Sequence, residues 1–346
     1  MKIVKKITEI DNLLYDDYVK SISNTLLFQS FKYIQSLTNL LNCNNETLIC
    51  FDITSKEITG VLPLLALSGK FGKVYNSLPF FGSNGGIIAA DAESKEALFN
   101  EFISIAKQAD TASIMISENP LLLSNLHSTN FDFVEERLCQ ISPIHFENNH
   151  AEMLMNQFHF KTRNMIRKSF KLGIEVSIDN TAIDFLYNTH IENMLAVEAK
   201  SKPHLFFENI ASFFEKNKDY KIYVAKYNGE IVAALLLFFY KDIAEYYTPV
   251  IKQEYRALQP NSCLIYQAMI DASEKGFKLW NWGGTGKNLD TLYRFKSRWG
   301  AKDYFYKYYG IINNKEILKS SPEELSQEYP FFYSVPFNLF ENKTYI

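Results

Sequence analysis

The chain has 346 residues, of which 47% are hydrophobic and 15% aromatic, so it can bury more than one core. Its net charge of -3 argues against a dedicated nucleic-acid binder, and we expect no DNA partner. The four cysteines form no CxxC pair and the six histidines no HExxH array, so we expect no metal site. No apolar run is long enough for a transmembrane segment, and no signal peptide is evident. We therefore expect a cytoplasmic protein, and peripheral work at the inner membrane face stays open.

The first half of the chain predicts helices, a strand pair, a loop rich in Gly, Pro and Asn, a further helix and two more strands. In chain order these elements are predicted at residues 11–23, 30–41, 47–53 with 60–67, 79–86, 94–109, 112–116 and 134–143.

The second half repeats this order of elements. They are predicted at residues 182–199, 205–216, 220–227 with 230–240, 249–260, 262–275, 277–282 and 304–312. Asn228-Gly229 is the strongest hairpin signal in the chain. The repeated order predicts a duplicated α/β fold, joined at the polar segment 148–157.

The most informative segment is LWNWGGTGKNLDTLYRFKSRWG, residues 279–300. An apolar strand breaks at Gly283-Gly284 and opens into Tyr293, Arg294 and Lys296. Glycines allow a ligand close to the backbone, and cations stabilise negative charge, so this pattern predicts an anion or carbonyl site. A plain strand-to-helix turn with a solvated basic face is the alternative.

A second candidate is the basic segment 161–176. Its first eleven residues carry five positive charges, among them Arg163, Arg167 and Lys168, and no acidic residue. On a helix, Arg167 and Lys168 share a face, and Ile166 and Phe170 share an apolar one. A phosphate-binding wall is one interpretation and an ordinary surface helix is the other.

A third candidate is the strand that ends in Tyr246 and Tyr247 and the helix that follows it. These two tyrosines point to opposite faces of the strand, so only one can reach a site beside it. Asn261 or Ser262 is a suitable N-cap, and an open helix N-terminus can bind an anion. An ordinary strand–loop–helix connection is the alternative.

Together, TRNMIRKSFKLGIEV, EYYTPV…YRALQPNS and WNWGGT…LYRFKSRWGA resemble the Fem family of peptidoglycan aminoacyltransferases and the wider FemAB-like acyltransferases of the GNAT superfamily. The resemblance covers about residues 28–310, including FQSFKYIQSL and PFFGSNGGI in the first half. It implies an α/β fold of two tandem GNAT-like domains, each a mixed, mostly antiparallel sheet flanked by helices. The domains would span residues 1–155 and 156–315, with the tail 316–346 packing back on the first.

The resemblance also implies roles for particular residues. Lys296 would stabilise the anionic intermediate or a phosphate, and Glu245 and Tyr247 occupy positions where GNAT relatives place a base or acid. The expected substrate- or donor-binding residues are Arg163, Arg167, Lys168, Arg256, Asn261, Ser262, Trp282, Gly283, Gly284, Thr285, Tyr293 and Arg294. One departure is that residues 256–261 lack the glycines of the usual pyrophosphate loop, which weighs against coenzyme A binding in the usual mode.

We expect an acyl- or aminoacyltransferase that acts on an amine of a cell-envelope precursor, either an amino sugar or a peptidoglycan precursor. The donor would be acyl-CoA or aminoacyl-tRNA, and the acceptor nucleotide- or lipid-linked, with no tightly bound cofactor. The alternative is a catalytically degenerate GNAT-fold protein that binds an envelope intermediate without turnover, since the sequence carries no Ser/His/Asp or Cys/His set.

Overall fold

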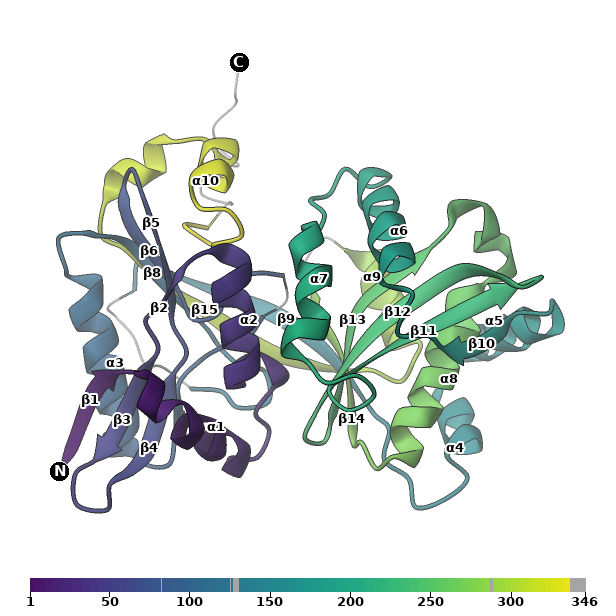
Figure 1. The fold of residues 1–346 in the computed structure, drawn as a ribbon, viewed down its shortest axis with the longest axis horizontal. Helices are drawn as coiled ribbons and strands as arrows, with labels where there is room; N and C mark the ends of the chain where they lie inside the picture. Colours follow the sequence, from purple (N-terminus) through teal and green to yellow (C-terminus); the bar gives the residue numbers. More distant parts are fainter. Residues whose placement is uncertain (82, 125, 127–130, 287–288, 337–346) are drawn as a thin grey trace. The chain divides into compact units, whose positions relative to one another are not determined.

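The computed structural model describes residues 1–81, 83–124, 126, 131–286 and 289–336, and the chain divides into two compact units. Unit 1 comprises Met1–Arg137 and the described residues from Phe305 onward, and unit 2 comprises Leu138–Tyr304. Each unit is an α/β body with its own hydrophobic core (Figure 1).

Unit 1 contains two sheets. One is antiparallel, with the order β1-β3-β4-β7, and the other has the order β15-β8-β6-β5-β2, in which only β6 and β8 are parallel. The elements of this unit, apart from the two strands that cross the unit boundary, are β1 (Lys2–Lys6), η1 (Glu9–Asp11), α1 (Asn12–Ser21), η2 (Leu27–Gln29), α2 (Phe31–Leu41), β2 (Asn44–Asn45), β3 (Leu48–Asp52), β4 (Glu57–Leu62), β5 (Leu65–Gly69), β6 (Gly72–Asn76), β7 (Ile88–Ala89), α3 (Ala92–Ala106), β8 (Thr111–Ser117), η4 (Lys315–Lys319) and α10 (Pro322–Glu328).

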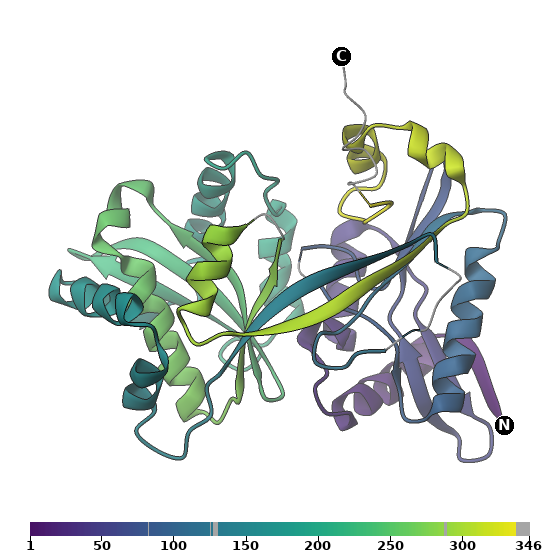
Figure 2. The same ribbon diagram turned by 180° about the vertical axis from the view of Figure 1, so that it is seen from behind.

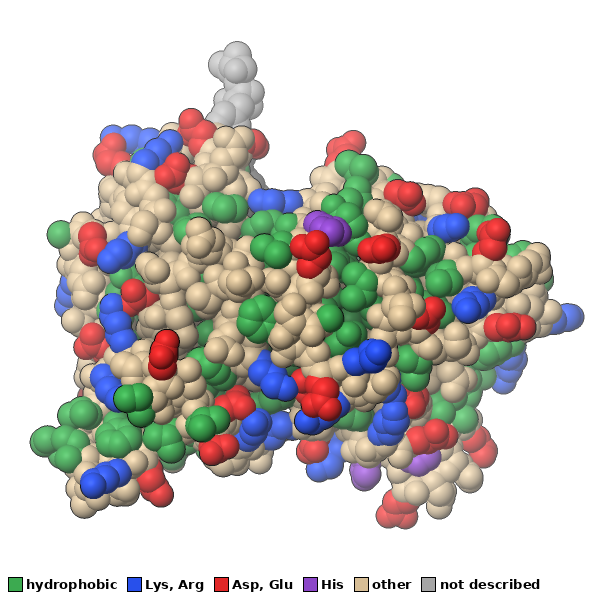
Figure 3. Space-filling model, in the orientation of Figure 1, with side chains coloured by type: hydrophobic (Ala, Val, Ile, Leu, Met, Phe, Trp, Pro, Cys, Tyr) green, Lys and Arg blue, Asp and Glu red, His purple; other side chains and the backbone are tan. Residues whose placement is uncertain are grey.

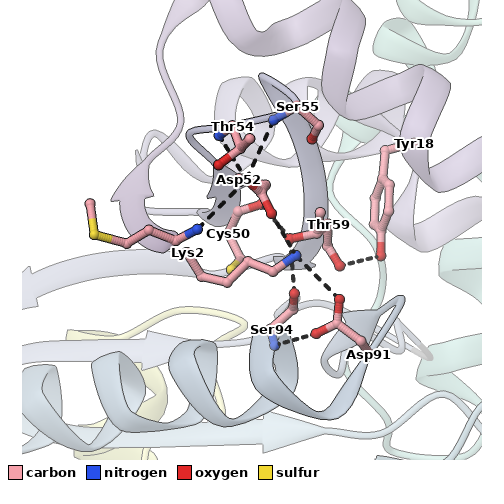
Figure 4. A network of polar contacts seen from close by, with 10 residues as sticks. Lys2, Tyr18, Cys50, Asp52, Thr54, Ser55, Thr59, Asp91 and Ser94 are labelled. Atoms are coloured by element: carbon pink, nitrogen blue, oxygen red, sulfur yellow. Dashed lines mark hydrogen bonds and ion pairs between the residues drawn. The ribbon is translucent and has the colours of Figure 1, made fainter.

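A polar network fixes the N-terminal strand of unit 1, as Figure 4 shows. The Lys2 ammonium lies 3.4 Å from the Asp52 carboxylate on β3 and 3.2 Å from that of Asp91. Asp91 is also the N-cap of α3, where it accepts the Ser94 N–H. One lysine therefore ties β1 both to its neighbouring strand and to the start of a helix.

Unit 2 contains one sheet with the order β10-β11-β12-β13-β14-β9, antiparallel except for the β13–β14 pair. Helix α8 packs on one face of it beside α4 and α5, and α6 packs on the other beside α7 (Figures 1 and 2). The remaining bounds are α4 (His150–Gln157), α5 (Phe160–Lys171), β10 (Glu175–Ile178), α6 (Ile183–Leu195), α7 (His204–Phe213), β11 (Tyr220–Tyr227), β12 (Glu230–Tyr240), β13 (Ile243–Ile251), η3 (Gln253–Leu258), α8 (Pro260–Glu274), β14 (Leu279–Thr285) and α9 (Asp290–Ser297).

Two long strands cross the boundary between the units, β9 (Phe133–Pro143) and β15 (Lys302–Ile312). In unit 2, β14 pairs with residues 138–143 of β9, and in unit 1, β8 pairs with residues 308–312 of β15. In unit 2, β14 thus has as its neighbour a strand from the first half of the sequence, and in unit 1, β8 has one from the second half. The repeated order of elements assigned 134–143 to the first half and 304–312 to the second.

This exchange is the reason that the units meet at 137/138 and 304/305, whereas we predicted domain boundaries at 155/156 and 315/316. The predicted junction 148–157 is largely helix α4, whose Leu154 belongs to the core of unit 2. The predicted fold class, with mixed, mostly antiparallel sheets flanked by helices, is confirmed.

The tail after 316 lies in unit 1 as far as the structure describes it, and residues 337–346 of the predicted tail lie outside the described residues. The Tyr329 hydroxyl donates to Gly72 O over 2.9 Å. The Asn76 side chain holds both backbone groups of Tyr333, with 2.6 Å to its N–H and 3.0 Å to its carbonyl oxygen.

On the face drawn in Figure 3, side chains of both charge signs are interspersed, in line with the small net charge. Within the described ranges, every helix is too short or too polar to cross a bilayer. The same residues bring no three metal-ligating side chains of the His, Cys, Asp or Glu type together.

Candidate functional site

The candidate site lies where β13 and β14 part in unit 2. The two parallel strands pair over only three residues, the last pair being Glu245 and Asn281. Beyond it β13 continues to Ile251 and β14 to Thr285, and no further register pair joins them within the described residues. Each strand also has a bulge there, at Tyr247 in β13 and after Asn281 in β14. We call this place the separation point.

Glu245 is a buried carboxyl at the separation point. Its side chain is 2% exposed, and burial raises its pKa to about 8, whereas the nearby Asn281 side chain lowers it. Its Oε1 has no hydrogen-bond partner. A buried acceptor without a donor costs free energy, which makes this carboxyl a candidate functional group.

Asn281, which is 1% exposed, faces Glu245 in the strand register. Its Oδ1 accepts the backbone N–H of Gly283 over 2.8 Å and the thiol of Cys139 over 3.2 Å. Its Nδ2 is buried without a hydrogen-bond partner of its own. The influence on the pKa of Glu245 places the two side chains close together, but without the geometry of a formed hydrogen bond.

Lys296 comes from α9 and is 3% exposed. Its Nζ donates to Gly283 O over 3.1 Å, Gly284 O over 2.8 Å and the Thr285 hydroxyl over 2.9 Å. Burial lowers the pKa of Lys296 to about 8. All three donors of the ammonium are used within the protein, so Lys296 fixes the glycine pair and Thr285 in place.

The aromatic residues around Lys296 form part of the core. Trp282 is 3% exposed, donates its Nε1 to Ser142 and packs against Phe295 and Trp299. It lies under the site rather than at its surface, although we predicted it to bind substrate. Phe295 and Trp299, on either side of Lys296 in the sequence, also pack against each other.

The two tyrosines of β13 pack on opposite faces of the sheet, as the period of a strand requires. Tyr246 packs against Trp280 and Trp282 in the core beneath α8. Tyr247 stacks on Phe206 of α7, and the ammonium of Lys202 lies 5.2 Å from the centre of its ring. Tyr247 is therefore on the face of α6 and α7. Burial lowers the pKa of the neighbouring Lys202 to about 8.

Two of the predicted flanking residues engage other partners. Tyr293 donates to Asp303 over 3.0 Å, and Arg294 is 67% exposed, 3.9 Å from Asp290 on its own helix. Arg294, two residues before Lys296, is turned away from the buried face of α9, and the Tyr293 hydroxyl is engaged by Asp303.

The start of α8 differs from the predicted N-cap. The helix begins at Pro260 after Gln259 in a left-handed conformation, so Asn261 and Ser262 lie inside its first turn. Proline has no N–H, and the Ser262 N–H already donates to Gln259 O, which leaves fewer donors for an anion. Asn261 Oδ1 is buried without a partner, and Arg256 is exposed in η3.

The basic segment forms α5, as predicted, and packs against α8. Arg167 and Lys168 are exposed, and Arg163 donates to the carbonyl oxygen of Phe158 over 2.7 Å. The buried side is Thr162, Ile166 and Ser169, while Phe170, predicted to share the apolar face, is 42% exposed.

Sequence reasoning missed three residues close to the site, namely Cys139, Asn281 and Lys202. One signal was present for Asn281, because it is a single polar residue between Trp280 and Trp282 in an apolar strand. Alternation places it on the face opposite the tryptophans. Cys139 and Lys202 reach the site from distant parts of the chain and had no such signal.

Residues 158–308 match the family model described as "Acetyltransferase (GNAT) domain". The structure of FemX is similar over 92% of this chain and 99% of its own, with a TM-score of 0.68 and 18% identity. The chain has the fold of Fem-like GNAT proteins. The predicted resemblance is therefore confirmed, and the GNAT domain match supports an N-acyltransferase.

Two further solved structures share the fold. A conserved protein of unknown function from Bacteroides thetaiotaomicron has a TM-score of 0.57 at 13% identity, over 90% of this chain and 100% of its own. The C-terminal domain of a putative lysylphosphatidylglycerol synthetase from Agrobacterium fabrum has a TM-score of 0.52 at 12% identity, over 87% and 92%. No curated protein gives a significant match.

Proposed function

We propose that this protein transfers an acyl or aminoacyl group to an amine of a cell-envelope precursor. The observation that carries the proposal is the separation point in the GNAT-matching part of the chain. There β13 and β14 stop pairing next to a buried carboxyl, Glu245, whose Oε1 has no partner. Unpaired strand edges can bind an extended donor, and the carboxyl can accept a proton from an amine.

The pKa of Glu245 suits the role of a general base. With a pKa of about 8, roughly one tenth of these carboxyls are ionised at pH 7 and half at pH 8. A base of this strength can take the proton from an attacking amine and return it to the leaving group. Tyr247 lies two residues along the strand, on the face of α6 and α7, where it would line the side from which an acceptor approaches.

Acyl-CoA and aminoacyl-tRNA both remain candidate donors. The match to the GNAT acetyltransferase model favours an acyl thioester as donor. FemX and the lysylphosphatidylglycerol synthetase domain have the same fold, and their names point to envelope chemistry. The reduced set of free N–H groups at the start of α8 weighs against a tightly held pyrophosphate. Arg163, Arg167 and Lys168 on the adjacent α5 would offer charge to tRNA or nucleotide phosphates instead.

The acceptor would be a nucleotide- or lipid-linked envelope precursor with a free amine, either an amino sugar or a peptide stem. We propose that the protein works in the cytoplasm, reaching a lipid-linked acceptor from the inner face of the membrane. Flotation with vesicles that carry such an acceptor would test the second part, because a protein without membrane affinity stays at the bottom of the gradient.

Donor and function can be tested together. The purified protein is incubated with labelled acetyl-CoA or with charged tRNAs, and with either glucosamine or a lysine-containing peptide as acceptor. Transfer of label to an amine would support the proposal and identify the donor class. Binding of an envelope precursor without any transfer would favour the alternative, a degenerate GNAT-fold binding protein.

A further inference from the structure

Asn281 occupies an unusual position for a polar residue. It lies in β14 between Trp280 and Trp282, both buried in the core beneath α8. Strand alternation directs its side chain to the other face, where it is 1% exposed and opposite Glu245. A fully buried amide in the middle of an apolar strand requires partners for its oxygen and its nitrogen.

The oxygen has two such partners, and the nitrogen has none. Oδ1 accepts from Gly283 N and from Cys139 Sγ, and these donors determine which end of the amide is oxygen. Nδ2 is buried without a partner. The Asn281 side chain lowers the pKa of Glu245 by a hydrogen-bond interaction, so Nδ2 faces that carboxyl without reaching full hydrogen-bond geometry. A buried donor held this loosely can turn to a ligand at low cost.

The amide donor of Asn281 and the carboxyl acceptor of Glu245 face each other, without a fully formed hydrogen bond, at the place where the strands part. A ligand that enters between β13 and β14 therefore meets one N–H donor and one carboxyl oxygen together. That pair matches an acyl carbonyl oxygen next to the nitrogen of an amine. Lys296, our first candidate for stabilising the intermediate, already donates to three acceptors.

We propose that Asn281 Nδ2 donates a hydrogen bond to the acyl carbonyl oxygen as negative charge develops on it, while Glu245 accepts the proton of the attacking amine. This assignment rests on the proposed function. Cys139 and the Gly283 N–H are then positioning groups, because they hold the Asn281 amide with its nitrogen towards the ligand.

In the proposed transfer, each bond that forms is matched by one that breaks. The amine nitrogen forms a bond to the acyl carbon, the carbonyl oxygen becomes an oxyanion bound by Asn281, and the Glu245 carboxylate takes one proton from nitrogen. The bond from the acyl carbon to the sulfur of a thioester, or to the oxygen of an ester, then breaks. Glu245 returns its proton to that leaving atom, and the carbonyl is restored.

Asn281→Ala removes the donor and leaves Glu245 in place. We expect the single-turnover rate with the active donor probe, acetyl-CoA or alanyl-tRNA, to fall about 10²–10³-fold, as for other single oxyanion donors. Binding of the deacylated probe, coenzyme A or uncharged tRNA, should change less than threefold, since it lacks the acyl oxygen. Asn180→Ala is the matched control, because Asn180 bonds Asn217 and Ile222 in the same unit.

The pH profile separates this role from mere packing. Asn281 lowers the pKa of Glu245, so its loss should move the rise of the rate with pH to higher pH. Asn281→Asp should lose the donor and move the profile in the same direction, because a second carboxyl disfavours ionisation of the first. Other ionisable groups near the pair are Cys139, Lys296, Tyr246 and Tyr247. Lys202 lies over the Tyr247 ring, and His190 Nε2 accepts the Lys202 backbone N–H.

The outcomes are distinguishable. An active wild-type protein with slow, pH-shifted Asn281 variants that still fold by circular dichroism supports the assignment. An active wild-type protein whose Asn281→Ala variant keeps its rate and profile overturns the assignment and leaves the proposed function standing. A wild-type protein that transfers no label from either donor to either acceptor overturns both.

Discussion

Each unit has a parallel strand pair connected through a helix, with α3 between β6 and β8 in unit 1 and α8 between β13 and β14 in unit 2. Within the described residues, the two pairs differ in what lies beyond their last register pair. In unit 2, β13 and β14 part after Glu245 and Asn281. In unit 1, β6 and β8 pair up to Asn76 and Met115, and the chain itself then occupies the gap. Ser77 N–H donates to Met115 O over 2.9 Å, and Gly85 N–H to Ser117 O over 3.0 Å.

The residues at the end of each pair differ accordingly. A Cβ on Gly85 would meet Ser77 O at 2.5 Å, so the loop fits against β6 only because residue 85 is glycine. Asn76 uses its amide to hold Tyr333 of the tail, whereas Asn281 keeps its Nδ2 unpaired. The unit 1 pair is thus closed by the chain's own contacts, and we propose that the unit 2 pair serves ligand binding instead.

Among the variants that test this difference between the units, Glu245→Gln should have the largest effect on the transfer rate. Removal of the base should lower the rate about 10²–10⁴-fold, while the neutral side chain keeps the fold. Single-turnover assays of Glu245→Gln measure this loss of rate, and Glu230→Gln, at an exposed position, is the control. A variant that retains its full rate would show that the buried carboxyl of unit 2 is structural.

The same variant carries a stability signature. The pKa of Glu245 is about 8 in the folded protein against 4.5 for an ordinary glutamate, so the folded protein holds a proton that the unfolded chain has lost between these pH values. Its contribution to stability therefore falls as pH rises from 4.5 to 8. The melting temperature of Glu245→Gln should fall less over this range than that of the wild type.

Lys296→Ala should reduce both stability and rate. Loss of the ammonium leaves Gly283 O, Gly284 O and the Thr285 hydroxyl without their donor, which should cost about 2–4 kcal/mol of unfolding free energy. The rate should fall because the glycine pair next to Asn281 loses its support. Denaturant unfolding and single-turnover assays measure the two effects, with the surface variant Lys218→Ala as control. A slow variant of unchanged stability would instead favour direct contact with the intermediate.

Asn76→Ala tests the unit 1 side of the comparison. It removes the partners of the Tyr333 N–H and carbonyl groups and should lower the unfolding free energy by about 2–4 kcal/mol. The rate per folded molecule should stay within twofold, because this amide serves the tail and no ligand. A rate loss as large as that of Asn281→Ala would contradict the division of roles between the units.

The double variant Arg167→Ala/Lys168→Ala should have the smallest effect. Both side chains are exposed on α5, so stability should change by less than about 0.5 kcal/mol. If α5 binds phosphates, affinity for tRNA should fall about tenfold and depend less steeply on salt. Filter binding of tRNA at several salt concentrations measures this change. Unchanged affinity would show that α5 is a solvated surface without a phosphate-binding role.

Much of the fold could be predicted because local signals were strong. The hairpin strands Tyr220–Tyr227 and Glu230–Tyr240 have the predicted bounds, since Asn228 and Gly229 adopt the positive φ angles of 50° and 85° that this turn requires. The predicted strand 60–67 is instead split between β4 and β5, which flank Pro63. The exchange of β9 and β15 could not be predicted, because no local pattern records which sheet a strand joins.

The site was predictable in part. The GGT segment and Lys296 were recognised, and they lie together with Glu245 around the separation point. The contacts of Lys296 were not foreseeable, because the bulge in β14 decides where the carbonyl groups of Gly283 and Gly284 point. Asn281 was missed because the role we propose for it depends on the surroundings of its Nδ2, which the packed structure reveals and the sequence does not.

Hydrogen–deuterium exchange with and without the donor that supports turnover tests the central claim most directly, that the donor binds where β13 and β14 part. The donor should slow exchange of backbone amides in residues 246–251 and 282–286 and leave residues 77–86 unchanged. Protection of residues 77–86 without protection of either unit 2 segment would place the donor in unit 1 and contradict the account.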